Sequence, residues 1–131
     1  MSKKEHVNQL IRDLKNGGLL TQKKAAKTLE KLGERAVAPL IQTLQDVNPG
    51  IRGYAAQILG RIGHKKAVEP LLLAIQDANP IVRMIAADVL KTIGDIRAIE
   101  PLRQLLKDNV RYVQIAAQEA LAHLQVKKSE D

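Results

Sequence analysis

The chain has 131 residues, a length that suits one domain with its own hydrophobic core. It has no cysteine, which excludes disulfide bonds and thiolate chemistry, and no apolar run approaches the ~18 residues that would cross a membrane. Aromatic residues make up 2% and the net charge is +7, so we expect an aliphatic core between packed helices and an acidic partner. The start "MSKKEHVNQL" lacks the apolar stretch of a secretory signal, which predicts a cytoplasmic protein.

The N-terminal segment 1–32 predicts a helical hairpin with a strongly basic second helix. The pair Gly17–Gly18 supplies the turn between the two helices. Eight Lys and Arg stand against three Asp and Glu in this segment, which therefore carries +5 of the net charge of +7. Four lysines share one stripe of the second helix: Lys23, Lys24, Lys27 and Lys31. Such a stripe is often only a solvated helix face, but it also suits an acidic ligand.

The rest of the chain repeats one pattern at a constant spacing of 31. The recurring residues are Pro39, Pro70 and Pro101, then Asp46, Asp77 and Asp108, and finally Leu59, Leu90 and Leu121. The segment 1–32 aligns with this pattern at a spacing of 30, as Leu10 does with Leu40 and Leu29 with Leu59. We therefore expect four repeats at about 3–32, 33–62, 63–93 and 94–124, followed by a charged tail at 125–131.

Each repeat reads as two helices. In "AVEPLLLAIQD" the apolar residues recur at helical spacing, and Pro70 is expected in the first turn, where its missing N–H costs little. The letters "ANP" then break the chain, an apolar stripe starting at Val82 predicts the second helix, and Gly94 marks its end. A single hairpin cannot cover its apolar face, so neighbouring hairpins must stack. The sequence predicts an all-α protein, a short α-solenoid forming a single domain over residues 1–131.

The segment "GHKKAVEPLLLAIQDANPIVRMIAADVLKTI" resembles the HEAT repeat, in the variety called phycobilisome-lyase HEAT-like. The resemblance rests on its Ala-Val-x-Pro-Leu opening, the Asp at the hairpin and Val-Arg-x-x-Ala-Ala in the second helix, and it covers about 120 residues. It implies a right-handed superhelix whose second helices line a concave side. Such repeats serve many partners, so the resemblance specifies the fold and not the function.

The two outer repeats depart from the pattern. Gln114 replaces the arginine of the middle repeats, and Gln118 replaces an alanine. The first repeat has Gln9 in place of the proline and Asn16 in place of the aspartate. These polar replacements predict that repeats 1 and 4 are solvated caps.

The recurring acid and cation pairs, Asp46 with Arg52 and Asp77 with Arg83, favour a structural role over catalysis. We expect the aspartate to cap the second helix and to bridge to an arginine of a neighbouring repeat.

No motif for catalysis, a cofactor or a metal is present. A Gly-rich phosphate loop, a Ser/His/Asp order and an HExxH helix are all missing. Of the three histidines only His123 has a carboxylate at helical spacing, Glu119, and two ligands are too few for a metal site. Asp88 and Glu119 occupy equivalent positions, but we expect water around them and so no raised pKa. The protein is therefore expected to be neither an enzyme nor a cofactor or metal carrier.

The positions that vary between repeats point away from the predicted core. They gather apolar, aromatic and charged residues in the groove lined by the second helices. The predicted protein-binding residues are Tyr54, Arg61, Ile81, Met84, Ile85, Asp88, Tyr112, Ile115 and Glu119. The isoleucines could instead be partly covered by adjacent helices, and Met84 could be an isolated exposed residue.

The sequence thus favours a non-enzymatic scaffold that binds a protein segment, with the lysines and Arg61 orienting an acidic stretch. Binding of nucleic acid or another polyanion through the basic repeat is the alternative, although residues 33–131 sum to only +2. An accessory subunit of the bilin lyase or chaperone type, which the family resemblance suggests, is the third. A monomer and a groove-mediated homodimer both stay open.

Overall fold

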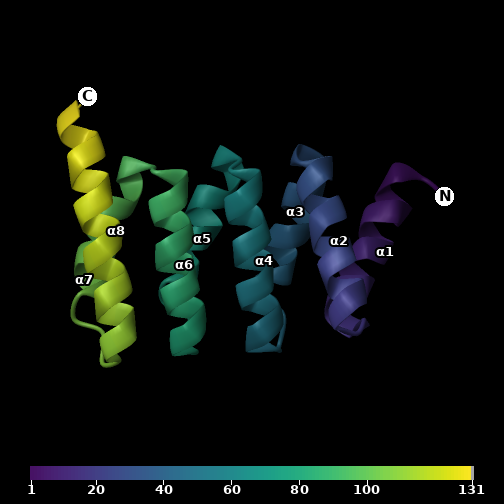
Figure 1. Cartoon of the computed structure of the whole chain (residues 1–131), viewed down its shortest axis with the longest axis horizontal. Coiled ribbons are helices and arrows are strands. Elements are labelled where there is room, and N and C mark those ends of the chain that lie inside the picture. The colour runs from purple at the N-terminus through teal and green to yellow at the C-terminus, as the bar shows by residue number, and fades with distance from the viewer. Residues whose placement is uncertain (131) are drawn as a thin grey trace. The chain divides into compact units, whose positions relative to one another are not determined.

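The computed structural model describes residues 1–130 and divides the chain into two compact units, Met1–Ala67 and Val68–Asp131. Within residues 1–130 the regular elements are α-helices and two short 3₁₀ helices, with no strand (Figure 1). The predicted all-α fold of stacked helical hairpins, an α-solenoid, is confirmed. That the two units form a single domain stays a prediction.

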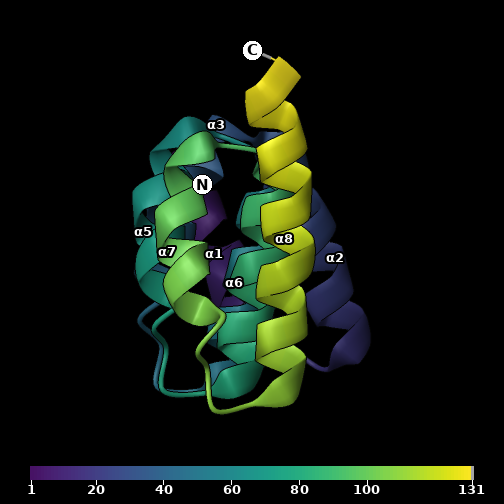
Figure 2. The same ribbon diagram turned by 90° about the vertical axis from the view of Figure 1, so that its left-hand side faces the viewer.

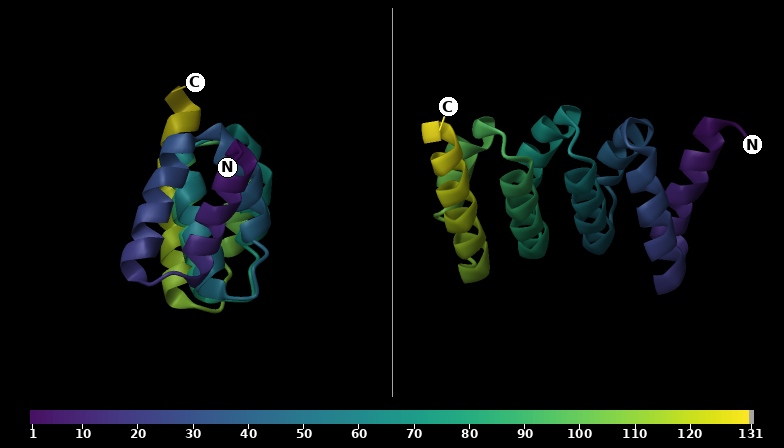
Figure 3. Two further views of the ribbon diagram at one scale, coloured as in Figure 1. Left: turned by 90° about the vertical axis from the view of Figure 1, so that its right-hand side faces the viewer. Right: turned by 45° about the horizontal axis from the view of Figure 1, so that its top comes forward.

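The first unit holds two hairpins. Its helices are α1 (Lys3–Asn16), α2 (Leu19–Leu32), α3 (Glu34–Thr43) and α4 (Pro49–Ile62), followed by the 3₁₀ helix η1 (Lys65–Ala67). Helix α1 pairs with α2 and converges with it toward their connecting turn, and α3 pairs with α4 (Figure 3). The hairpins stack because α1 also packs on α3 and α2 on α4. Leu14, Leu29 and Leu40 are fully buried between them.

The second unit repeats this arrangement. It contains α5 (Val68–Ala74), α6 (Pro80–Ile93), the 3₁₀ helix η2 (Ile96–Ala98), α7 (Ile99–Leu105) and α8 (Arg111–Glu130). Helix α8 packs on both α6 and α7, and Leu71, Leu90 and Leu102 are fully buried in this unit. Residues 125–130, expected as a charged tail, continue α8, which extends beyond α7 (Figure 2).

Proline takes the expected place in two repeats and not in a third. Pro70 and Pro101 are the third residues of α5 and α7, inside the first turn. Pro39 is the sixth residue of α3, so the expectation is wrong there. In the other two repeats a short 3₁₀ helix precedes α5 and α7. The equivalent residues of this repeat form the first turn of α3, which begins directly after Gly33, so the proline lies further into the helix.

Asparagine, and not the predicted aspartate, caps the second helices of the two middle repeats, α4 and α6. The side chain of Asn48 accepts a hydrogen bond from the backbone N–H of Gly50 at 2.8 Å, and Asn79 accepts one from Ile81 at 2.8 Å. Asp46 and Asp77 lie two residues earlier and accept from the N–H groups of Asn48 and Asn79, at 3.0 and 2.8 Å. The aspartates therefore stabilise the turn that leads into the helix, one step before its cap.

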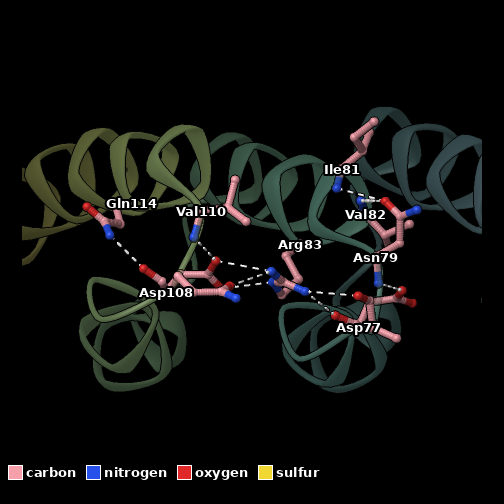
Figure 4. A network of polar contacts seen from close by, with 10 residues as sticks. Asp77, Asn79, Ile81, Val82, Arg83, Asp108, Val110 and Gln114 are labelled. Atoms are coloured by element: carbon pink, nitrogen blue, oxygen red, sulfur yellow. Dashed lines mark hydrogen bonds and ion pairs between the residues drawn. The ribbon is translucent and has the colours of Figure 1, made fainter.

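The predicted bridge between repeats is present in the second unit. Arg83 of α6 donates from Nε to Asp108 Oδ2 at 2.8 Å and from Nη2 to Asp108 Oδ1 at 3.1 Å (Figure 4). It also donates from Nη1 to the carbonyl oxygen of Asp77 at 2.8 Å, which ties it to its own hairpin turn. Burial opposes ionisation of Asp108, but the hydrogen bonds from Arg83 and from the N–H of Val110 outweigh it and lower the pKa of that carboxyl.

In the outer repeats other residues make the contacts that the arginine makes in the middle repeats. In the first unit, Lys15 Nζ of repeat 1 lies 3.2 Å from Asp46 Oδ1 of repeat 2. The N–H of Asn48, with Lys15 beside it, lowers the pKa of Asp46 despite partial burial. In repeat 4, Gln114 Nε2 donates to the carbonyl oxygen of Asp108 at 2.6 Å and so keeps only the contact within its own hairpin. Over residues 1–130, no helix is long and apolar enough to span a membrane.

Candidate binding surfaces on the second helices

The predicted binding residues divide between the two compact units. In the second unit they lie on α6 and α8, which run side by side (Figure 1). Three of them are exposed apolar side chains: Ile81 is 52% exposed, Tyr112 42% and Ile115 38%. Met84 and Ile85 are partly exposed. We name the surface of α6 and α8 that carries these five residues, together with Asp88 and Glu119, the α6–α8 face.

The orientation of this face follows from the helical period. On α6 the core side is held by Val82 and Leu90, which are 1% and 0% exposed. Ile81, Met84 and Asp88 follow one another at i, i+3 and i+7 and so form a stripe on another side of the helix. On α8 the same spacing joins Tyr112, Ile115 and Glu119. Each member of one stripe thus has a counterpart at the equivalent position of the neighbouring helix.

The acidic end of the face corrects one expectation. Asp88 was expected to have an ordinary pKa, but partial loss of water around its carboxyl group raises it above 3.8. The like charge of Glu119 raises it further, while Lys91 acts in the opposite direction. Within residues 1–130, no ion pair reaches either carboxylate. The sequence alone did not show that the two side chains are close enough to repel.

In the first unit the predicted residues form a basic surface. Lys23, Lys24, Lys27 and Lys31 of α2 are all exposed. Lys27 and Lys31 line a hollow of about 620 Å³ together with Arg61 of α4, and Glu30 adds the one acidic side chain of its lining. The structure therefore joins two of the four lysines to Arg61. Lys23, Lys24 and the half-buried Tyr54 do not line this hollow.

Sequence reasoning missed a second basic hollow in the same unit. Lys3 and Lys4 of α1 and Arg35 of α3 line a hollow of about 410 Å³ whose lining contains no acidic residue. Val7, one turn after Lys3, is buried next to it. The charge count of residues 1–32 signalled the lysines, but only the packing of α1 on α3 brings Arg35 beside them.

A hollow of about 910 Å³ in the second unit lies at the hairpin turns, and Arg83 and Asp108 are among its lining residues. These two groups are hydrogen-bonded to each other, so neither is available as a free acid or base. In the part of the chain that the structure describes, no three His, Cys, Asp or Glu side chains are grouped so as to hold a metal ion. His123 is exposed. The Nε2 atom of His64 lies 3.6 Å from Oε1 of Glu34.

Comparison with protein families matches residues 37–122 to the HEAT repeats and residues 21–46 to the PBS lyase HEAT-like repeat. A search of curated proteins finds no match.

Solved structures share the fold over most of this chain. Human deoxyhypusine hydroxylase is 27% identical to this chain, with a TM-score of 0.82. The match covers 97% of this chain and 46% of the hydroxylase, so this chain spans about half the length of that protein. The complex of CpcE and CpcF of phycocyanin lyase from Nostoc sp. PCC7120 is 26% identical with a TM-score of 0.79, over 92% of this chain and 78% of that one. An engineered protein, 22% identical with a TM-score of 0.58, covers 92% of this chain and 62% of its own and shows the fold alone.

Proposed function

The chain belongs to the HEAT repeat family, and we propose that it is a protein-binding module whose α6–α8 face holds a segment of a partner protein. The observation that carries this proposal is the group of exposed apolar side chains, Ile81, Tyr112 and Ile115, on two adjacent helices. Large apolar and aromatic side chains in contact with water are typical of interaction surfaces when they gather on one face.

The physical basis is burial of apolar area on a rigid support. Removing apolar surface from water contributes about 25 cal/mol per Å², and central aromatic or aliphatic anchors contribute most of the affinity in many interfaces. The backbone below the face is fixed by a fully buried core that includes Leu90 and Leu102. A partner segment would therefore bind without the cost of ordering this surface.

The structural relatives support a protein partner. The CpcE and CpcF structure is a complex of two proteins, and the chain matched in it shares this fold at 26% identity. The same relative, with the PBS lyase HEAT-like match, supports a second candidate, an accessory role beside a lyase. A visible absorption band on the purified protein would favour that role. We propose that the chain is not itself a catalyst, because Arg83 and Asp108, the buried ion pair that lines the hollow at its hairpin turns, are bonded to each other.

A displayed library of random 12-residue peptides, selected on the purified protein, tests the proposal. We expect wild type to enrich peptides with a shared apolar motif, and the variant Met84→Glu with Ile115→Glu to lose them, because unpaired charges would be buried in the contact. Leu73→Glu is the matched control, since Leu73 is 68% exposed on α5 and outside the α6–α8 face. Loss of the peptides in the control alone, or no enrichment on wild type, would contradict the proposed face.

Binding of nucleic acid stays the alternative because the first unit has two hollows lined by lysine and arginine side chains. Fluorescence anisotropy with a labelled single-stranded RNA would test it. A phosphate-binding surface loses orders of magnitude in affinity between about 50 and 200 mM salt. A complex with that salt dependence, weakened by Lys27→Glu with Lys31→Glu and unchanged by Met84→Gln, would replace the protein-binding proposal.

A further inference from the structure

The α6–α8 face changes in character along its length. We call two residues at equivalent positions of the packed helices α6 and α8 a rung. The first two rungs are apolar: Ile81 with Tyr112, and Met84 with Ile115. The third rung pairs two carboxylates, Asp88 and Glu119. A segment lying along the face would therefore contact apolar surface at one end and two like charges at the other.

The two carboxylates are not neutralised by the protein. Asp88 and Glu119 are close enough to interact electrostatically, and among the described residues neither forms an ion pair. Lys91 attracts Asp88 through space, so one positive charge stands near two negative charges. The His123 side chain, four residues after Glu119, is exposed and not bonded to it in the described part of the chain. The third rung keeps an unbalanced negative charge.

A partner that covers the apolar rungs also removes water from this charge. Burying a carboxylate without a counter-charge is costly, and two adjacent carboxylates repel more strongly as water leaves. A neutral or acidic segment would leave that cost in place, whereas a lysine or arginine would remove it. Charge complementarity therefore decides which class of apolar segment can bind here.

We infer that the occupant of the α6–α8 face is a partner segment with apolar anchors followed by a lysine or arginine that lies between Asp88 and Glu119. This inference rests on the proposed function and specifies its ligand. The third rung is four residues beyond the Met84–Ile115 rung, about 6 Å along the helix axis. The basic residue is therefore four positions from an apolar anchor in a helical segment, or two positions in an extended one, about 6.6 Å.

The peptide selection described above tests the inference with one more variant, Asp88→Asn with Glu119→Gln. This variant keeps the size of both side chains and the apolar rungs. Peptides enriched on wild type should carry Lys or Arg at the stated spacing from Leu, Ile or Phe. The best such peptide should bind this variant about tenfold more weakly than it binds wild type at physiological salt. The analogue of that peptide with Lys→norleucine should bind wild type about tenfold more weakly than the parent peptide does.

The outcomes separate the inference from the function it rests on. Peptides whose binding needs Met84 and Ile115 but that carry a neutral or acidic residue where we expect Lys or Arg would overturn the inference. The protein-binding function would then still stand. No enrichment on wild type, or enrichment insensitive to Met84→Glu, would overturn both. A salt-sensitive homodimer by light scattering, dissociated by Asp88→Asn with Glu119→Gln and by Lys27→Glu with Lys31→Glu, would identify a second copy as the occupant and overturn the inferred partner.

Discussion

Replacement of Arg83 by methionine tests what joins one hairpin to the next. The change removes two hydrogen bonds to the carboxylate of Asp108 and the bonds to the carbonyl oxygens of Asp77 and Ala78 (Figure 4). The side chains of Arg83 and Asp108 are 13% and 8% exposed, so the pair is largely buried. Removing one partner of a buried pair costs about 3–5 kcal/mol. Because Asp108 keeps the N–H of Val110, we expect a loss of about 2–4 kcal/mol.

Two further variants divide this loss into its parts. Arg83→Gln should cost less, about 1–2 kcal/mol, because Gln114 in the next repeat shows that a glutamine here still donates to the carbonyl of its own hairpin. Arg111→Met is the matched control, since Arg111 is exposed and donates only to the side chain of Gln114 in the described structure. Its cost should stay below about 0.5 kcal/mol.

Urea unfolding gives these free energies, and pH adds an independent check. The pKa of Asp108 is lowered in the folded state, so its ionisation stabilises the fold above pH 3.8, and this contribution disappears as pH falls through the folded pKa. The difference between wild type and Arg83→Met should therefore shrink in acid. If Arg83→Met costs no more than Arg111→Met at neutral pH, the bridge does not stabilise the stack and the reasoning fails.

Three other substitutions test the core, the acidic rung and a helix end. Leu90→Ala should lower the free energy of unfolding by about 2–5 kcal/mol because Leu90 is fully buried. Met84→Ala should lower it by less than about 1 kcal/mol because Met84 is partly exposed; equal losses in urea unfolding would place Met84 in the core. Asp88→Asn should raise the melting temperature at pH 7 and not at pH ~3, because a raised folded pKa means that ionisation destabilises the fold as pH rises; a variant no more stable at pH 7 would contradict this. Gly94→Ala should cost about 1–2 kcal/mol because Gly94 has φ +75°, whereas Gly18→Ala, with open space at its Cβ, should be close to neutral in the same measurement.

The buried leucines and the glycine that ends a second helix could be predicted from sequence because these residues recur. The leucines that recur in the second helices are buried as expected, with Leu59 and Leu90 at 0% and Leu121 at 6% exposure. Helix α6 ends where a glycine was expected, at Gly94, and α4 ends in the same way at Gly63; both glycines have positive φ. Stacking multiplies one local pattern, so a single correct repeat predicts its neighbours.

The helix starts were predicted less well because they depend on single positions. The cap was assigned to the aspartate, although the adjacent letters Asn-Pro, as in Asn79 and Pro80, are the pair that places a capping side chain directly before the first helical residue. The start of α3 could not be read from Pro39, because the turn before it is helical in this repeat and 3₁₀ in the next two. Turn geometry differs between repeats even where the sequence pattern does not.

The charged sites could be predicted only in part because charge depends on neighbours in space. The exposure of Ile81 and Ile115 followed from the helical period, whereas the raised pKa of Asp88 needs the distance to Glu119 on another helix. The hollow between Lys3 and Arg35 needs the packing of α1 on α3 in the same way. Which residues serve as site residues stays a prediction that the binding experiments above decide.

Two kinds of charged residue can nevertheless be told apart in this chain. Charges that recur in every middle repeat are used by the fold itself, as the Arg83 guanidinium is shared between Asp108 and the Asp77 carbonyl oxygen. Lys27 and Asp88 occupy equivalent positions whose charge changes sign between repeats, and neither forms an ion pair in the described part of the chain. A ligand can compete only for groups that the fold has not already engaged. Substitutions of the first kind should therefore change the free energy of unfolding, and those of the second kind should change binding far more than stability.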